Sequence, residues 1–145
     1  MSDSRSIHEL LEQYSDSHRN PVNELIHMVC VPLIVFSLLG LLWAVHPLVA
    51  AIAAAGAMVY YFKLSVPFAK GMLIMALIML GVLAALPPIT VLPLSIAIFV
   101  LAWVGQFIGH QIEGKKPSFF DDLRFLLIGP LFVLSFLYRR LHWAY

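Results

Sequence analysis

A glutamine, a histidine and a glutamate follow the last long apolar run of this sequence. They are Gln106, His110 and Glu113 in the segment WVGQFIGHQIEGKKPS, residues 103–118. On an α-helix of 3.6 residues per turn, these spacings place the three side chains within about 60° of one another. Ionisable residues at membrane depth usually face the interior of a helical bundle and mark functional sites. The segment therefore predicts a polar cluster inside a membrane protein.

A second polar group stands at the beginning of the first apolar run. Asn23 and His27 are four residues apart and share one helical face, and His18 precedes them. Neutral imidazole binds Fe, Zn, Cu or Ni, and two histidines with one carboxylate form the facial arrangement of Fe(II) oxygenases. With His110 and Glu113 included, the residue types indicate a non-haem metal site but do not choose among these metals.

The same residues also have an interpretation without metal chemistry. In it, His18 and Glu113 are hydrated at the membrane surface, His27 bonds a backbone carbonyl, and Gln106 joins two helices. Polar residues near the ends of membrane spans can reach the interface on flexible side chains without any function. The protein would then be a lipid-binding or scaffolding protein to which no metal binds.

A haem is the other alternative. His27 and His110 are candidate axial ligands of a haem in a four-helix membrane cytochrome, and Gly105 and Gly109 would make room for the ring. This interpretation leaves the remaining histidine and the glutamate without a role. The same two glycines, spaced by four residues, also predict a close approach by a neighbouring helix.

Composition shows which elements must position these residues. The 145 residues are 61% hydrophobic and 12% charged, and the mean hydropathy is +0.91, whereas soluble domains are about 45–50% apolar. This predicts a single all-α integral membrane domain over residues 1–145. The net charge of +1, without a basic cluster, gives no support to nucleic-acid binding. The one cysteine, Cys30, excludes an internal disulfide.

Four apolar stretches are long enough to be membrane spans. We predict them at about 25–45, 47–66, 68–86 and 89–110. Asn20 is a suitable N-cap and Pro21 a suitable first residue for the first helix, and His46 is expected to cap the turn at the opposite membrane face. A fifth apolar run, 125–138, has only fourteen residues. We therefore predict that it is a half-span or re-entrant segment.

The first twenty residues predict an interfacial helix. Ile7, Leu10, Leu11 and Tyr14 recur at the spacing of an amphipathic helix, which we expect to lie on the membrane surface. His18 would continue its buried stripe. The segment 1–20 has no apolar core of the kind that a secretory signal needs, so we expect it to be retained.

The distribution of Lys and Arg predicts the orientation in the membrane. Basic residues precede the first span, lie between 63 and 70, and follow the fourth span, whereas the turns at 46–47 and 87–88 contain none. By the positive-inside rule, both termini and the 63–70 loop are expected to be cytoplasmic, provided that 125–138 does not cross. Both polar groups then lie at the same cytoplasmic depth.

The two polar groups carry a resemblance to a known membrane family. In YSDSHRNPVNELIHMVCVP and GQFIGHQIEGKKP, and over about residues 8–142, the chain resembles the membrane-embedded 2-hydroxy fatty acid dioxygenases, typified by an enzyme of phytosphingosine breakdown. The matching positions are Tyr14, His18, Asn23, His27, Pro32, Gln106, Gly109, His110, Glu113 and Pro117. The family pattern has Gly at Cys30 and Ala at Ser118, and we expect both departures to affect packing more than chemistry.

The resemblance implies an enzyme that uses Fe(2+) and O2 to cut the C1–C2 bond of a long-chain 2-hydroxy fatty acid and shorten it by one carbon. It implies a bacterial inner membrane or an endoplasmic reticulum membrane, according to the source. The implied metal ligands are His18, His27, His110 and Glu113, of which the last three are also the implied catalytic residues. Residues expected to orient ligands or substrate are Tyr14, Asn23 and Gln106.

Overall fold

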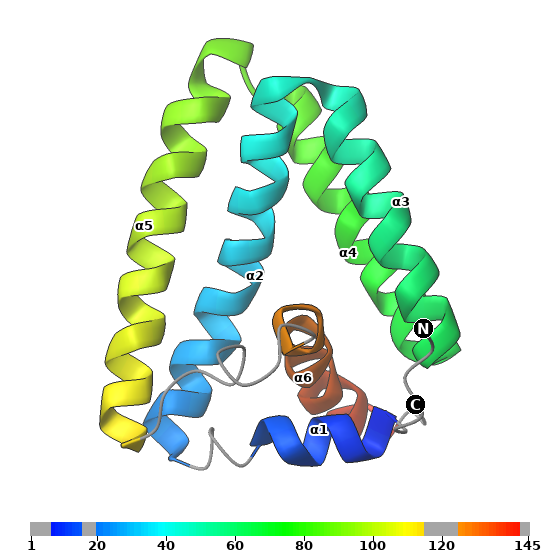
Figure 1. Ribbon diagram of the computed structural model, residues 1–145, viewed down its shortest axis with the longest axis vertical. Coiled ribbons are helices and arrows are strands. Elements are labelled where there is room, and N and C mark those ends of the chain that lie inside the picture. The colour runs from blue at the N-terminus through cyan, green and yellow to red at the C-terminus, as the bar shows by residue number, and fades with distance from the viewer. Residues whose placement is uncertain (1–6, 16–19, 115–124, 143–145) are drawn as a thin grey trace.

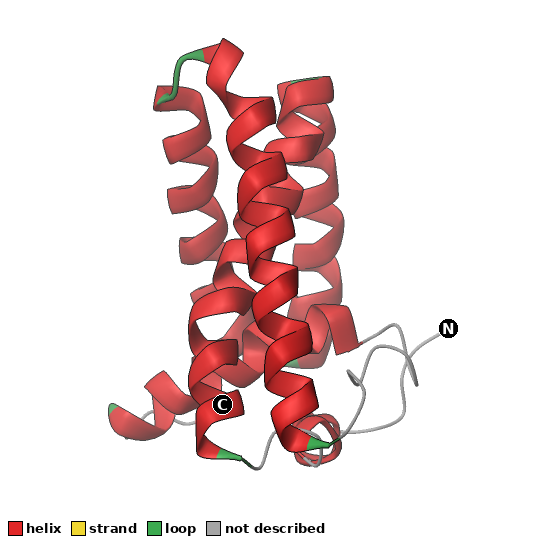
Figure 2. Ribbon diagram, turned by 90° about the vertical axis from the view of Figure 1, so that its left-hand side faces the viewer, coloured by secondary structure: helices red, strands yellow, loops and turns green. Residues whose placement is uncertain are grey.

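The computed structural model describes residues 7–15, 20–114 and 125–142. Over these ranges the protein consists of six helices and has no strand (Figures 1 and 2). The helices are α1 (Ile7–Ser15), α2 (Pro21–Val45), α3 (Pro47–Leu64), α4 (Val66–Ala85), α5 (Pro88–Glu113) and α6 (Phe125–Arg140). Helices α2 to α5 are long and apolar enough to cross a membrane. The predicted all-α, four-span architecture is confirmed.

Local capping explains where the first two spans begin. The side chain of Asn20 accepts a hydrogen bond from Val22 N at 2.9 Å, and Pro21 is the first residue of α2. Nδ1 of His46 accepts a hydrogen bond from Leu48 N at 3.0 Å. Both N-terminal caps satisfy backbone donors that a helix leaves without a partner. The caps predicted at these positions are confirmed.

Two helix boundaries differ from the predicted spans. The turn between α3 and α4 is reduced to Ser65, and Val66 and Pro67 already belong to α4, because proline is tolerated in the first turn of a helix. Helix α5 continues past residue 110 to Glu113 and ends at Gly114, whose φ of +77° is readily adopted only by glycine. Glu113 is therefore held on the same helix as His110.

Helices α2 and α5 pack closely through small residues. A Cβ atom added to Gly105 would lie 2.7 Å from Cys30 Sγ, and one added to Gly109 would collide with the side-chain oxygen of Asn23. The close approach predicted for the two glycines is confirmed, and Cys30 is a packing residue of this contact. The polar ends of the two helices are thereby held side by side.

Helices α1 and α6 complete one end of the bundle (Figure 1). There α2 begins, α5 ends, and α3 joins α4; we call it the α1 end. Helix α1 lies across it and α6 fills only the lower half of the bundle, as expected for a half-span. The apolar stripe of α1 is buried, as predicted, and α6 is the element that α1 contacts most. The stripe thus packs against protein, whereas a surface helix alone would bury it in lipid.

Candidate functional site

Four buried polar side chains meet where α2 begins and α5 ends. Asn23 and His27 come from α2, and Gln106 and His110 from α5; their exposed fractions are 0%, 1%, 6% and 4%. Burying such groups costs free energy unless they bind a partner. The structure therefore brings the two polar groups of the sequence together in one buried cluster.

The two histidines of this cluster are in direct contact. The ring centroids of His27 and His110 are 4.9 Å apart, and the ring planes are perpendicular, at 90°. The contact is possible because Gly109, next to His110, lets α5 approach Asn23 of α2. Two imidazoles from distant parts of the sequence therefore share one buried position.

The backbone of α2 orients the ring of His27. Nδ1 of His27 lies 3.2 Å from the carbonyl oxygen of Asn23. A carbonyl oxygen only accepts hydrogen bonds, so this contact requires the hydrogen on Nδ1 and leaves a lone pair on Nε2. Histidines that bind metals usually donate their other N–H to a carbonyl or carboxylate in this way. The tautomer of His27 suits a metal ligand.

Glu113 links the end of α5 to the beginning of α2. Its Oε1 accepts hydrogen bonds from the backbone N–H of Asn20 at 2.8 Å and from Nδ2 of Asn23 at 3.2 Å. Asn23 is also the residue whose carbonyl contacts His27. The carboxylate therefore fixes the residue that orients the first histidine.

The described residues do not by themselves form a complete metal site. Within 7–15, 20–114 and 125–142, no three His, Cys, Asp or Glu side chains are grouped so that they could hold an ion. His18, one of the four predicted ligands, lies outside these ranges. Of the predicted ligands His18, His27, His110 and Glu113, the structure brings His27 and His110 into contact but does not group Glu113 with them. The complete set stays a prediction.

Tyr14 brings α1 and α6 to the histidines. Its ring centroid is 6.2 Å from that of His27 and 4.9 Å from that of Phe132 on α6. Burial raises the pKa of the Tyr14 hydroxyl above its usual value, so the group stays protonated. A Cβ on Gly129 would lie 3.1 Å from this hydroxyl. Phe132 and Gly129 could not be predicted as neighbours of the site, because the sequence of an apolar helix does not show which neighbour the helix will contact.

Gln106 lies one turn before His110, and its side chain is buried. Among the described residues, no hydrogen-bond partner reaches its Oε1. A buried acceptor of this kind costs about 1–3 kcal/mol when nothing bonds it. The amide is thus suited to accept a hydrogen bond from a bound molecule.

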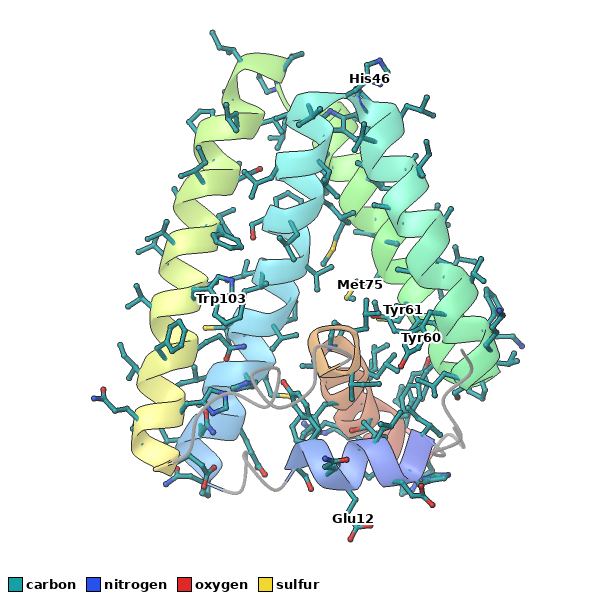
Figure 3. All side chains as sticks on the ribbon, in the orientation of Figure 1. Glu12, His46, Tyr60, Tyr61, Met75 and Trp103 are labelled. Atoms are coloured by element: carbon teal, nitrogen blue, oxygen red, sulfur yellow. The ribbon has the colours of Figure 1, made fainter. Side chains whose placement is uncertain are left out.

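Two further histidines, His46 and His8, lie away from this cluster. His46 is exposed at the end opposite to α1 (Figure 3), and His8 is exposed on α1. The placement of His46 agrees with the prediction that it caps the turn at the opposite membrane face. His46 is therefore a natural control for the two buried histidines.

Comparison with known proteins identifies the family. A family described as "2-hydroxy-palmitic acid dioxygenase Mpo1-like" matches residues 4–141. The chain belongs to this Mpo1-like family. A relative, the 2-hydroxy-palmitic acid dioxygenase MPO1 of Saccharomyces cerevisiae, is 30% identical over 135 residues, which cover 87% of this chain and 76% of the yeast protein. No solved structure matches the chain.

The Mpo1-like match includes both polar groups. It extends across all six helices, from before α1 to the end of α6. The resemblance inferred from the two sequence blocks is confirmed. The buried cluster of His27 and His110 is therefore a feature of a chain that is Mpo1-like over nearly its whole length.

Proposed function

We propose that this Mpo1-like protein is an Fe(II)-dependent dioxygenase that uses O2 to cleave the C1–C2 bond of long-chain 2-hydroxy fatty acids. The products are a fatty acid shortened by one carbon, CO2 from C1, and water, so that one O2 supplies the four-electron oxidation. The proposal rests on the buried contact between His27 and His110, whose ring centroids are 4.9 Å apart. The yeast relative is named a 2-hydroxy-palmitic acid dioxygenase, which supports the reaction and the class of substrate.

The donor types in the cluster fit iron. His27 presents Nε2 because Nδ1 faces the carbonyl of Asn23, and its ring is close enough to His110 for one ion to contact both. Imidazole nitrogens with a carboxylate are the usual ligands of Fe(II) in oxygenases. We assign the ion to His27 and His110, with His18 and Glu113 as further ligands. The side chain of Glu113 has to move toward the histidines to take part, because the described structure does not group it with them. When bound, iron supplies Lewis acidity and redox chemistry toward O2.

The remaining side chains have roles in positioning. The free Oε1 of Gln106 is placed to accept a hydrogen bond from the 2-hydroxyl group of the substrate. The carbonyl of Asn23 keeps the ring of His27 in one orientation. Tyr14 contacts His27 and, together with Phe132, covers the cluster and excludes water from it. The substrate keeps its tail among the apolar spans and brings its polar end to the α1 end.

The geometry does not favour a haem between the two histidines. A haem with two axial imidazoles separates their coordinating nitrogens by about 4 Å, twice the length of one metal–nitrogen bond, and the ring centroids by more. His27 and His110 instead make an edge-to-face contact with perpendicular planes. Rings that touch each other leave no space for a porphyrin plane.

The proposal is tested with protein purified in mild detergent and loaded with Fe(II). We expect it to convert 2-hydroxypalmitic acid and O2 to the acid one carbon shorter, as measured by mass spectrometry and oxygen consumption. His27→Ala and His110→Ala should each lose most bound iron and most cleavage, because each removes one ligand. Iron is measured by elemental analysis.

His46→Ala is the matched control, since His46 is exposed at the opposite end of the bundle. This variant should keep both iron and activity. Stoichiometric iron without any cleavage of 2-hydroxy acids would show that the assigned reaction is wrong. If iron disappears from the His46 variant but remains in those at His27 and His110, the site itself is misplaced.

A further inference from the structure

An apolar groove lies between α4 and α6, outside the histidine cluster. Its volume is about 570 Å³, within the range of about 300–1,000 Å³ for small-molecule sites. Six residues that characterise its lining are Lys70, Ile74, Met75, Ile78, Leu134 and Leu137. Figure 3 shows Met75 beside the upper end of α6. Nothing in the proposed reaction uses this groove.

The groove has one polar end and one apolar end. Lys70 and Tyr138 stand at the α1 end, where Tyr138 donates a hydrogen bond to the carbonyl oxygen of Pro67 at 2.7 Å. The lining on α4 then continues to Met79, about 14 Å further along a helix that rises 1.5 Å per residue. Half of a bilayer's hydrocarbon core is about 15 Å thick. The groove therefore extends from one interface to about the middle of the membrane.

Lys70 supplies a positive charge at the interfacial end. Its side chain is exposed, and it makes no ion pair with any of the described residues. An ammonium group beside apolar surface attracts an anion more strongly than it does in bulk water. A chain-shaped apolar groove with one cation at its mouth is complementary to a single-chain anionic amphiphile.

We propose that this groove binds one long-chain carboxylic acid, with the tail along α4 and α6 and the carboxylate at Lys70. The size and charge of the groove are independent of the reaction, but the choice of a carboxylic acid rests on the proposed function. An acid bound in the groove has its carboxylate at the α1 end, which is also the end that contains the histidine cluster.

The groove and the histidine cluster lie on different faces of α6. Phe132 contacts Tyr14, which covers the cluster, whereas Leu134 lines the groove. Two residues along a helix correspond to a rotation of about 200°. Binding in the groove is therefore separable from binding at the histidines.

The test uses photo-crosslinking of the purified full chain in nanodiscs. The probe is palmitic acid with a mid-chain diazirine and a terminal alkyne; it lacks the 2-hydroxyl group, so labelling does not depend on turnover. We expect labelled peptides from α4 and α6. Ile78→Trp should abolish most labelling by filling the groove, and Lys70→Gln should weaken binding by about fivefold, the upper range for an exposed ion pair.

Matched controls separate the groove from general membrane partitioning. Leu77 is next to Ile78 and equally exposed, 60% against 62%, but does not line the groove; Leu77→Trp should not change labelling. Lys63→Gln removes another basic side chain at the α1 end and should also leave labelling unchanged. Equal labelling of the Ile78 and Leu77 variants would overturn the proposal. Displacement of the probe by phosphatidylglycerol as effectively as by palmitic acid would overturn the choice of a carboxylic acid.

Discussion

Glu113 illustrates how one side chain can combine two roles at this site. Its Oε1 accepts hydrogen bonds from Asn20 and Asn23 at the beginning of α2, and Asn23 in turn orients His27. The carboxylate is also the acidic ligand that we propose for iron. A substitution that removes the negative charge of Glu113 but keeps an oxygen that accepts hydrogen bonds separates these two roles.

We predict that Glu113→Gln keeps the fold but binds iron at least about tenfold more weakly, because the amide oxygen can still accept both hydrogen bonds but is a poor ligand for Fe(II). Glu113→Ala should lose iron and also lower the midpoint of thermal unfolding, because it leaves the donors at the start of α2 without their acceptor. Elemental analysis and thermal unfolding in detergent measure the two effects. Full iron content in the Gln variant would show that Glu113 positions α2 without binding metal.

At the scale of elements, the contact between α2 and α5 depends on small residues. Gly109 faces the side chain of Asn23, Gly105 faces Cys30, and a Cβ added to Gly40 would collide with Ser95. In lipid, helices associate through close packing and interhelical hydrogen bonds, because the apolar surface gains little by leaving the bilayer. The separation of His27 and His110 therefore depends on how closely these two helices approach.

We predict that Gly109→Ala lowers the free energy of unfolding by about 1–3 kcal/mol, the usual cost of adding a carbon atom to a packed interface. The added Cβ would collide with the amide of Asn23 and push α5 away from α2. Iron binding should also decrease, since the two histidines come from these two helices and would move apart. Thermal unfolding and iron content are measured on the same preparation.

Gly56→Ala is the control for this change. Gly56 is also within a membrane-spanning helix, but nothing lies within 4 Å of an added Cβ. Alanine favours a helix over glycine by about 1 kcal/mol, so this variant should be as stable as the wild type or more stable. Equal stability of the Gly109 and Gly56 variants would contradict the close approach of α2 and α5.

Across the bundle, basic residues gather at the α1 end. Lys63 and Lys70 flank the turn between α3 and α4, and Arg139 lies beside His8 and Glu12 of α1. The buried cluster of His27 and His110 is at the same end. By the positive-inside rule, we propose that the α1 end, and with it the site, faces the cytoplasm.

This orientation predicts the outcome of cysteine labelling in sealed vesicles. In a Cys30→Ala background, Leu48→Cys should react with a membrane-impermeant maleimide only from the non-cytoplasmic side, because Leu48 is exposed at the end opposite to α1. Lys63→Cys should react only from the cytoplasmic side. The reverse pattern would mean that the site opens to the other compartment.

The membrane class, the four spans and the N-caps of the first two spans could be predicted from the sequence alone. Apolar runs of this length have few alternatives to a membrane-spanning helix, because the backbone must satisfy its own hydrogen bonds in lipid. Asn20 and His46 cap helices through contacts two residues away, so neighbouring residues suffice to predict them. The spacing of Gln106, His110 and Glu113 likewise fixed which face of α5 carries the polar groups.

Which of the polar groups meet depends on how the helices pack. The contact of His27 with His110, the hydrogen bonds of Glu113 to Asn20 and Asn23, and the packing of α6 on α1 join residues far apart in the chain. An apolar helix in lipid is almost equally apolar on every side, so its sequence period does not show which side faces a neighbour. The partners are instead chosen by close packing at small residues such as Gly105 and Gly109, which operates only after the helices have assembled.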